Sequence, residues 1–511
     1  MGNPVLKTPN IDAIAAEGRR FEKFYVSIPI CMPNRATLFT GRMPSLHGAR
    51  CNGAPLSLSS NTMTELMRSA GYHTELIGKA HLQNMTGRPA MSPRPEHPGL
   101  TEPAPALAEA RLNPWSDGRY DQEDSRLWAE NQDYDVSLPY YGFAQMDLST
   151  LHGDMVGGNW RRWARRNCAD FDSRVGPDNA APDPRYRTPQ AYRTRVPEEI
   201  YPTRYVVDRT LERLDALSAD ADTPFFLVAS FPDPHHPFTP PGRYWDLYDP
   251  ATIPVPASLA GGEKGATPAL AHLRAARAAG SANTQGTLPY AVDAREAQEA
   301  IALTYGMIAM IDDGVGEITA RLAELGLDDN TVVIFMSDHG DFMGDHGLML
   351  KAALHYQGLV RVPFIWKEPG LPQPGVATQA LHSTVDIARS ILKRAGLAPY
   401  IGMQGTDLAA SLADPAAKGA EAVLIEEDGH EPAMGFAAPV RVRSVLTARH
   451  RLSIYEGVTW GELYDLQEDP HETTNLFDDP SSEPLRRRMF ELLARQMMIH
   501  ADRSPFPTGR A

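Results

Sequence analysis

The apolar residues of this chain alternate between helical spacing and short continuous runs. The longest helical stripe has an apolar residue at every third or fourth position and comprises Ile308, Ile311, Val315, Ile318, Leu322 and Leu325. Past Gly326, residues 331–336 are mostly β-branched, which is typical of a buried strand of a parallel sheet. Repeated alternation of such helices and strands predicts an α/β fold with a mainly parallel sheet flanked by helices.

Other segments follow the same pattern and place polar residues soon after strands. The predicted elements are a capped helix near residues 8–18, a helix over about 61–70, a strand over 73–77, a helix containing Val207, Leu211 and Leu214, and a strand over 225–228. Lys79, His235 and Asp338 each come soon after a predicted strand. Because functional loops of such sheets gather at the carboxyl ends of the strands, we expect these three side chains to share one site.

The chain is long enough for one large domain with a smaller appendage. Two segments, about 101–203 and 251–289, have weak periodicity and are rich in proline, so we interpret both as insertions. Later elements are shorter, with strands predicted over 422–426 and 440–446 and a final helix over about 483–500. We therefore expect a main domain over 1–400 and a smaller C-terminal α+β domain on an antiparallel sheet over 401–511.

Composition and charge narrow the class of protein. The formal net charge of -15 argues against a general nucleic-acid binder, because phosphate contacts need a basic surface. No apolar stretch is long enough to span a bilayer, and the first residues have no signal-peptide core. The three cysteines are too few for a disulfide framework and fit a reducing compartment, so we expect a cytoplasmic protein without nucleic-acid or membrane partners.

The run that begins at Cys31 is the most specific motif of the chain. From Cys31 to Arg42 the sequence reads CMPNRATLFTGR. Pro33 suits the first turn of a helix, since it has no N–H to leave unpaired. Cys31 would then lie at the positive end of that helix and face an anionic substrate. A lone cysteine in such a place most often only caps the helix, but the pattern of Pro, Arg, Leu, Thr and Gly that follows favours a chemical role.

This run resembles the signature of the formylglycine-dependent sulfatases of the alkaline-phosphatase superfamily. Other motifs are similar to elements of that family and occur in its order: Gly78–Lys79–Ala80–His81–Leu82, with Ala80 in place of the usual Trp; Pro234–His235–His236–Pro237; Ser337–Asp338–His339–Gly340 with Gly344, His346, Gly347 and Lys351; Arg361–Val362–Pro363; and Glu462–Leu463–Tyr464–Asp465–Leu466 with Asp469, Pro470, Asn475 and Leu476. Each short motif alone is weakly specific, but the ordered set covers nearly the whole chain. The resemblance implies an alkaline-phosphatase-like fold, with the sulfatase catalytic domain in residues 1–400.

The resemblance also implies a modified cysteine and a metal ion. A maturase would convert Cys31 to 3-oxoalanine (formylglycine), whose hydrate attacks a small sulfate monoester and forms a covalent sulfo-enzyme. A divalent cation, Ca²⁺ or otherwise Mg²⁺ or Mn²⁺, would be held by Asp338, His339 and the modified Cys31. A carboxylate oxygen is a hard ligand that suits these cations, and the cation would neutralise charge on the sulfate.

By the same resemblance, Arg35 holds the modified side chain, and Lys79 and Lys351 bind sulfate oxygens. His235 also binds substrate, as the partner of the leaving oxygen, and His81 is the base that releases sulfate. Taken singly, each of these residues has an ordinary explanation, such as a turn or a solvated lysine. Only their place in the ordered set favours the catalytic interpretation.

The chain departs from the family pattern ahead of its first helix. Family members begin with a strand that ends in acidic residues and completes the metal shell, whereas no Asp–Asp pair precedes Cys31 here. We expect a truncated start, because the later catalytic positions are intact. An inactive truncated chain is the alternative.

The residues leave the choice of ester open, with an arylsulfatase-like activity as the default. Trp160, Trp163 and the neighbouring arginines could line a pocket for an aryl or sugar sulfate, or could form an amphipathic helix packed on the main domain. The rival function is a phosphonate monoester hydrolase or phosphodiesterase, and a lesser rival is a protein that only binds an anion. Those hydrolases tend to lack the Lys-x-His pair, so Lys79 and His81 favour sulfate. A homo-oligomer is compatible with the chain, with the helix near 483–500 as the candidate contact.

Overall fold

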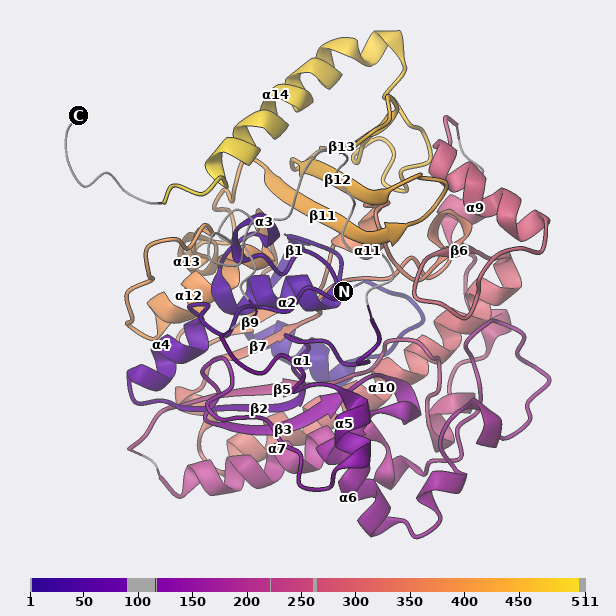
Figure 1. Ribbon diagram of the computed structural model, residues 1–511. Helices are drawn as coiled ribbons and strands as arrows, with labels where there is room; N and C mark the ends of the chain where they lie inside the picture. Colours follow the sequence, from indigo (N-terminus) through magenta and orange to yellow (C-terminus); the bar gives the residue numbers. More distant parts are fainter. Residues whose placement is uncertain (1, 90–114, 116, 221, 261–263, 505–511) are drawn as a thin grey trace, which may run out of the picture.

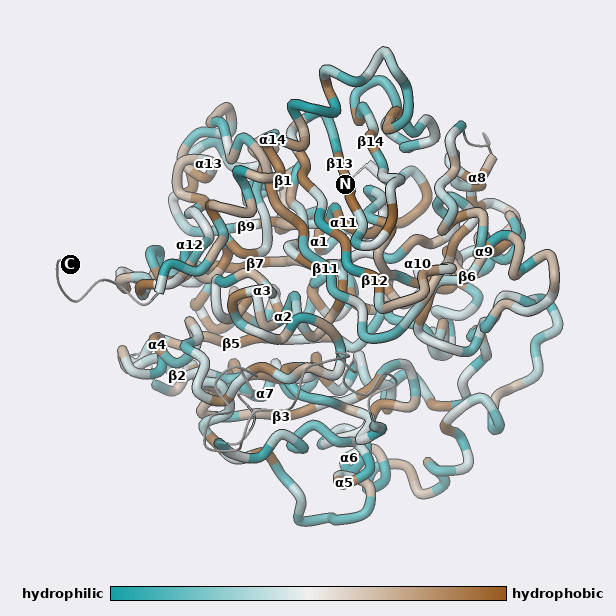
Figure 2. The backbone as a smooth tube through the Cα atoms, turned by 45° about the horizontal axis from the view of Figure 1, so that its top comes forward, coloured by the Kyte–Doolittle hydropathy of each residue, from teal (hydrophilic) through white to brown (hydrophobic). Residues whose placement is uncertain are grey.

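The computed structural model describes residues 2–89, 115, 117–220, 222–260 and 264–504 (Figure 1). Its strands form two four-stranded mixed sheets, a two-stranded ribbon and a four-stranded antiparallel sheet in the C-terminal part. Helices cover the sheets, and hydrophobic segments gather toward the interior of the molecule (Figure 2). The expectation of an α/β fold with a C-terminal antiparallel sheet is confirmed, but the sheets expected to be mainly parallel are mixed, and β7 (Val333–Met336) pairs antiparallel with its neighbour.

The first sheet contains β1 (Arg19–Tyr25), β7 (Val333–Met336), β9 (Phe364–Lys367) and β10 (Thr378–Ser383), in the order β10–β1–β9–β7. β1 is parallel to β10, whereas β9 is antiparallel to both β1 and β7. The apolar pattern of the chain does not predict β1, because charged residues such as Arg19 interrupt it. Arg19 is nevertheless fully buried. Its two terminal nitrogens donate to the carbonyl oxygens of Pro372, Gln373, Val376 and Leu412, which offsets part of the cost of burying the charge.

The second sheet contains β2 (His73–Lys79), β3 (Gln145–Thr150), β4 (Gly157–Gly158) and β5 (Phe225–Ser230), in the order β4–β3–β2–β5. β2, β3 and β5 are parallel, so their carboxyl ends lie at the same edge. β3 lies within 101–203, the segment interpreted as an insertion, and pairs with β2 from Glu75–Gln145 to Lys79–Ser149. That segment therefore contributes a strand to the sheet that carries Lys79.

β5 and β7 are the facing edges of the two sheets (Figure 1). Among the described residues β5 pairs only with β2, and β7 pairs only with β9. Residues 225–229 and 333–336 are apolar, yet they are only half-buried. In the inner strand β9, by contrast, residues 364–366 are buried.

The helices are α1 (Pro9–Glu17), α2 (Cys31–Thr40), α3 (Pro44–His47), α4 (Met63–Ser69), α5 (Ser125–Glu130), α6 (Asn159–Asn167), α7 (Pro202–Ser218), α8 (Ala257–Ala260), α9 (Pro268–Ala278), α10 (Ala294–Glu324), α11 (Gln357–Val360), α12 (Ile387–Arg394), α13 (Ala409–Ala413) and α14 (Glu483–Ile499). α10 begins at a capping box between Asp293 and Glu296. Its apolar stripe packs Ile311 and Val315 against α1 and β9. In the part of the chain that the structure describes, no helix is long and apolar enough to cross a membrane.

The C-terminal sheet is an antiparallel meander of β11 (Val423–Pro432), β12 (Pro439–Leu446), β13 (His450–Tyr455) and β14 (Gly461–Asp465). α14 covers it, and Met489 and Leu493 of that helix join a hydrophobic cluster with apolar residues of the strands. Ile425 and Val442 instead belong to the cluster that contains Phe364 of the first sheet. The C-terminal sheet is thus packed on the rest of the protein, and a domain boundary near residue 400 stays a prediction.

A buried ion cluster joins the C-terminal sheet to the segment that follows it. Arg451 is fully buried and donates to Glu472 at 2.6 Å and to Glu462 at 3.1 Å. The guanidinium also lies over the rings of Tyr356 and Tyr464. A buried cation with two carboxylate partners is costly to break, because removal of the arginine would leave both carboxylates buried without a counter-charge.

Candidate active site

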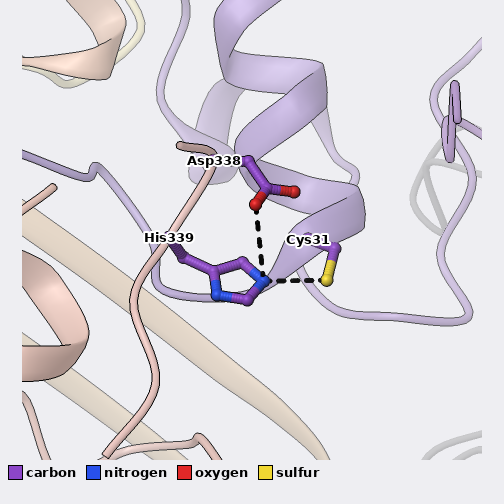
Figure 3. A group of neighbouring side chains, drawn as sticks. All are labelled: Cys31, Asp338 and His339. Carbon is purple, nitrogen blue, oxygen red and sulfur yellow. Dashed lines mark hydrogen bonds and ion pairs between the residues drawn. The ribbon is translucent and has the colours of Figure 1, made fainter. Parts of the chain in front are cut away.

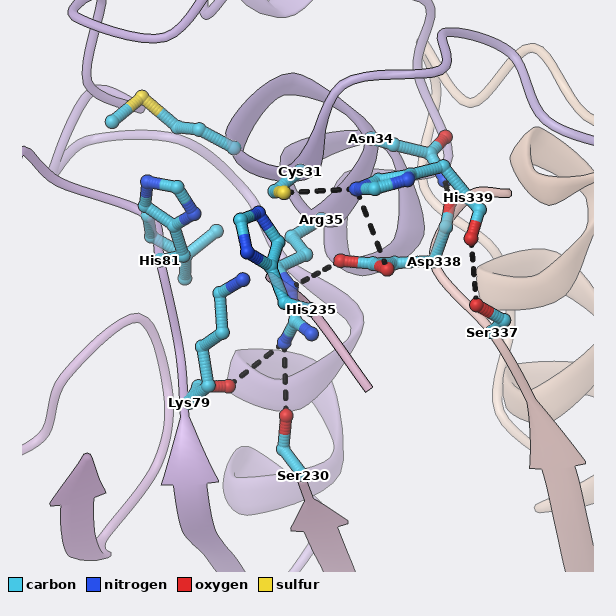
Figure 4. Close-up of polar contacts among 12 residues, drawn as sticks. Cys31, Asn34, Arg35, Lys79, His81, Ser230, His235, Ser337, Asp338 and His339 are labelled. Carbon is cyan, nitrogen blue, oxygen red and sulfur yellow. Dashed lines mark hydrogen bonds and ion pairs between the residues drawn. The ribbon is translucent and has the colours of Figure 1, made fainter. Parts of the chain in front are cut away.

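The predicted site residues converge where the N-terminus of α2 meets the carboxyl ends of β2, β5 and β7 (Figure 4). Cys31 is the first residue of α2, and Pro33 lies in its first turn. Gly41 ends the helix in the left-handed conformation, with φ of 62°. Cys31 is only 1% exposed, so its sulfur lies inside the site at the positive end of the helix.

Two nitrogen-bearing side chains contact the Cys31 sulfur. His339 Nε2 lies 2.8 Å from Sγ, and Lys351 Nζ lies 3.1 Å from it. Burial alone would raise the pKa of the thiol, but His339, Lys351 and Lys79 together lower it well below its usual range. Position 31 therefore has surroundings that stabilise negative charge.

Cys31, Asp338 and His339 are the candidate metal ligands, and their ligand atoms all lie within 4.8 Å of one another (Figure 3). His339 Nδ1 lies 2.6 Å from the carbonyl oxygen of Gly340, so Nδ1 carries the proton and Nε2 can bind a cation. Burial would raise the pKa of Asp338, but His339 and Arg35 keep it below its usual range, and the carboxylate is ionised. These donors fit part of the shell of a hard divalent cation, since Ca²⁺ takes about six to eight ligands.

Arg35 connects the ends of three strands (Figure 4). Its Nε donates to Asp338 Oδ2 at 2.8 Å. One terminal nitrogen donates to the carbonyl oxygen of Lys79 at 2.8 Å and to the hydroxyl of Ser230 at 2.9 Å. Lys79 ends β2, Ser230 ends β5, and Asp338 lies two residues after the end of β7. The guanidinium therefore bridges the facing sheets and orients Asp338.

Lys79 and Lys351 approach Cys31 from different elements. Lys79 ends β2, whereas Lys351 follows β8 (Leu348–Met349), which forms the two-stranded ribbon with β6 (Tyr290–Ala291). Both lysines are buried, and Lys351 Nζ lies 3.0 Å from His235 Nε2 and 3.1 Å from His339 Nε2. Burial lowers the pKa of Lys79, while the charge at Cys31 opposes this effect. Two ammonium groups thus point into the space around Cys31, as sulfate ligands would.

Two other histidines of the site, His81 and His235, are neutral at neutral pH. Burial lowers the pKa of His81 to about 4. Burial and the charge of Lys351 lower the pKa of His235 to about 3. His235 Nδ1 lies 2.6 Å from the carbonyl oxygen of His236, which places the proton of the neutral ring on Nδ1. A neutral ring can accept a proton, which is what the proposed base at His81 requires.

Glu123 and His152 belong to the site but were not among the predicted site residues. The buried carboxylate of Glu123 accepts hydrogen bonds from the backbone N–H groups of His81, Leu82 and Gln83 at 2.7, 2.8 and 3.0 Å. It thereby holds the turn after β2, where His81 has φ of 53°.

His152 comes just after β3, and its Nε2 lies 2.9 Å from Lys79 Nζ. Its ring stacks on that of His235, with centroids 3.5 Å apart. The one signal that could have found His152 is its place after a strand, and the weak periodicity of this segment concealed β3.

Farther along the chain, Trp160 is fully buried on α6, and its indole donates to the carbonyl oxygen of Ile200. Of the two alternatives for this segment, a substrate pocket or an amphipathic helix packed on the main domain, the structure therefore shows the packed helix.

Comparison with known proteins gives the family. The sulfatase family model matches residues 1–397, and the model of the C-terminal region of N-sulphoglucosamine sulphohydrolase matches residues 344–498. The chain is 25% identical to an arylsulfatase of Clostridium perfringens over 484 residues, which span 93% of this chain and 86% of the relative. It is 26% identical over 526 residues to PehA, a multifunctional alkaline phosphatase superfamily protein of Trinickia caryophylli, with 98% of this chain and 91% of the relative covered.

Among solved structures, a phosphonate monoester hydrolase of Agrobacterium radiobacter is similar with a TM-score of 0.73 and 24% identity, over 98% of this chain and 93% of that chain. This likeness shows a common fold. The family match spans the segments that carry Cys31, Lys79, His235, Asp338 and Lys351. The chain therefore belongs to the sulfatase family, and its named sulfatase relatives support a sulfuric ester hydrolase.

Proposed function

We propose that this protein hydrolyses small sulfate monoesters, with an arylsulfatase-like activity, through a formylglycine derived from Cys31. The observation that carries the proposal is the convergence of Lys79, Lys351 and neutral histidines on Cys31 at the positive end of α2. A sulfate monoester carries one negative charge on three equivalent oxygens. Buried ammonium groups on separate elements can hold such a group and stabilise the charge that develops on it.

The residues of the site divide into charge carriers and proton carriers. A cation held by Asp338, His339 and the modified residue 31 would supply positive charge, and the modification would supply the attacking hydroxyl. Lys79 and Lys351 bind sulfate oxygens, and the fixed guanidinium of Arg35 keeps Asp338 in place.

His235 and His81 act in different steps: His235 when the ester oxygen leaves, and His81 when sulfate is released. Lys351 Nζ donates to His235 Nε2 at 3.0 Å, so both side chains lie where the ammonium group of Lys351 can supply the proton for the leaving oxygen. The neutral ring of His81 accepts a proton from the side chain at position 31 when sulfate is released. Its lowered pKa keeps the ring in the accepting form at neutral pH.

A second candidate function is hydrolysis of phosphonate monoesters or phosphodiesters. It is supported by the fold shared with a phosphonate monoester hydrolase and by the likeness to a multifunctional relative. The paired Lys79 and His81 at the end of β2 favour sulfate, because the phosphonate hydrolases tend to carry hydroxyl side chains there. The third possibility is an inactive chain.

One comparison of substrates tests the proposal. The protein, expressed with a formylglycine-generating maturase, is assayed with an aryl sulfate and with a phenyl phosphonate ester of the same aryl group. We expect faster turnover of the sulfate, none in Cys31→Ala, and a peptide in which residue 31 has lost its sulfur with two hydrogen atoms and gained one oxygen atom. Turnover retained in Cys31→Ala would end the formylglycine proposal, and faster turnover of the phosphonate would establish the second candidate.

We also propose the partners and the location of the protein. The partners are a small-molecule sulfate ester and the maturase, and the location is the cytoplasm. A homo-oligomer through α14 is supported by its exposed Met497, Met498 and Ile499. Size-exclusion chromatography with light scattering, applied to a variant with these residues changed to Ser, tests the contact.

A further inference from the structure

Lys351 lies in a loop whose backbone is strained. The loop runs from the end of β8 to the start of α11. Leu350, Ala352 and Ala353 have φ of 68°, 155° and 42°, in the left-handed region that residues with a side chain rarely adopt. Such conformations persist only where the surrounding structure holds them. Something outside the loop must therefore fix the position of Lys351.

Glu427 is the group that holds this loop. The backbone N–H of Ala353 donates to both carboxylate oxygens of Glu427, at 3.0 Å each. Glu427 Oε2 also lies 3.1 Å from His355 Nε2, farther along the same loop. Glu427 is 3% exposed and His355 fully buried, so water does not compete for these hydrogen bonds.

The hydrogen bonds continue into the C-terminal sheet. His355 Nδ1 lies 2.7 Å from the hydroxyl of Ser444, which lies 2.6 Å from the hydroxyl of Ser453. Glu427, Ser444 and Ser453 belong to β11, β12 and β13, and Ser444 and Ser453 are paired in the register. A buried polar chain thus runs across three strands of the C-terminal sheet and ends on the loop that carries Lys351.

We propose that Glu427, supported by His355, is a positioning residue for Lys351, so that the C-terminal sheet sets the place of one sulfate-binding lysine. The assignment of sulfate to Lys351 rests on the proposed function, whereas the anchoring of the loop does not. Glu123 makes an analogous arrangement at the other lysine, because its carboxylate holds the strained turn that follows Lys79. Each lysine is then placed by a buried glutamate that does not itself touch the substrate.

The chain offers a matched control one residue away. Glu426 lies on the same strand and is 6% exposed, but its carboxylate accepts hydrogen bonds from the backbone and hydroxyl of Ser45, away from the loop. Glu427→Leu and Glu426→Leu therefore remove equally buried carboxylates. Only the first change leaves the Ala353 N–H without a partner.

Hydrogen–deuterium exchange of a peptide spanning 349–356 measures the loop directly, without any assumption about substrate. We expect exchange at least about 10-fold faster in Glu427→Leu than in the wild-type protein, and no change in Glu426→Leu. Glu427→Gln keeps one acceptor oxygen and the shape of the side chain, so it should fold in any case and show a smaller increase. Unchanged exchange in both Glu427 variants would overturn the proposal.

Turnover of an aryl sulfate measures the consequence for Lys351. Because a displacement of about 1 Å can lower a rate about 100-fold, kcat/KM should fall to that extent in Glu427→Leu and stay near wild type in Glu426→Leu. In a Lys351→Met background, Glu427→Leu should lower kcat/KM by less than about threefold more, since the residue that it positions is already gone. A further loss of the full size would mean a merely structural role and would overturn the proposal. An inactive wild-type protein would instead overturn the proposed function, and the exchange result would still decide the anchoring.

Discussion

His47 should make the protein less stable in mild acid. It ends α3, is 7% exposed and lies outside the metal cluster. Its Nδ1 accepts a hydrogen bond from the N–H of Ala49 at 3.2 Å, and its Nε2 lies 3.0 Å from the hydroxyl of Thr37. A proton on Nδ1 would face another donor. Burial and the nearby charge of Arg42 accordingly lower the pKa of His47 from 6.5 to about 3.

The sign and size of the effect follow from the two pKa values. Above pH 6.5 the ring is neutral in both the folded and the unfolded chain, so its ionisation does not affect stability. As the pH falls from 6.5 toward about 3, only the unfolded chain takes up the proton, and the free energy of unfolding decreases. At about pH 5 the loss is RT ln(1 + 10^1.5), or about 2 kcal/mol.

The assay compares the wild-type protein with His47→Gln by urea unfolding at about pH 7.5 and about pH 5. The quantity of interest is the change in unfolding free energy between the two pH values, so a constant effect of the substitution cancels. We expect that change to be about 2 kcal/mol smaller in His47→Gln than in the wild type. The same substitution at exposed His272 is the control and should alter nothing. An equal pH dependence in wild type and His47→Gln would refute the reasoning.

Four further predictions concern the site and the core. Lys351→Met should lower kcat/KM for an aryl sulfate about 100- to 1,000-fold in steady-state assays, because it removes a charge that touches the reacting group. A chelator should abolish turnover, and added Ca²⁺ or Mg²⁺ should restore it. Asp338→Asn should raise the cation concentration needed for half-maximal recovery about 10- to 100-fold. Recovery at the wild-type concentration would show that Asp338 is not a ligand. Because the pKa of His81 is lowered to about 4, the acid limb of the kcat/KM profile assigned to this base should lie near pH 4, and a limb near 6.5 would contradict the assignment. Arg451→Met should reduce the free energy of unfolding by about 3–5 kcal/mol in urea titrations, since it leaves two buried carboxylates without a cation.

The sequence predicts those parts of the fold whose signal is local. The stripe from Ile308 to Leu325 falls in α10, and the apolar run at 331–336 contains β7. β1 was missed because a strand with buried Arg19 resembles an exposed segment until the carbonyl oxygens that receive the guanidinium are known. β3 was missed because its residues, QMDLST, include only two apolar side chains, which is too short a pattern to stand out in a polar segment. Its place in the sheet comes from its pairing with β2, which no local pattern encodes.

The same division holds for the site. Cys31, Lys79 and Asp338 lie in short motifs, so the sequence indicates their chemistry, and the structure brings them together. Glu123 and Glu427 lie in no motif, and their importance arises from backbone N–H groups that lie 40 or more residues away in the chain. A glutamate in a sequence has the statistics of a surface residue, and only the fold shows that these two are buried anchors.

The Arg35 guanidinium contacts both facing sheets, so it also holds the two sheets together at the site. One guanidinium links the strand ends of two layers that share no ladder of hydrogen bonds between β5 and β7 in the described residues. Lys79 belongs to one layer and Asp338 to the other, while Lys351 belongs to a loop anchored on the C-terminal sheet. An anion bound by both Lys79 and Lys351 would link the second sheet to the loop that is anchored on the C-terminal sheet. Substrate binding would then also make the catalytic face more rigid.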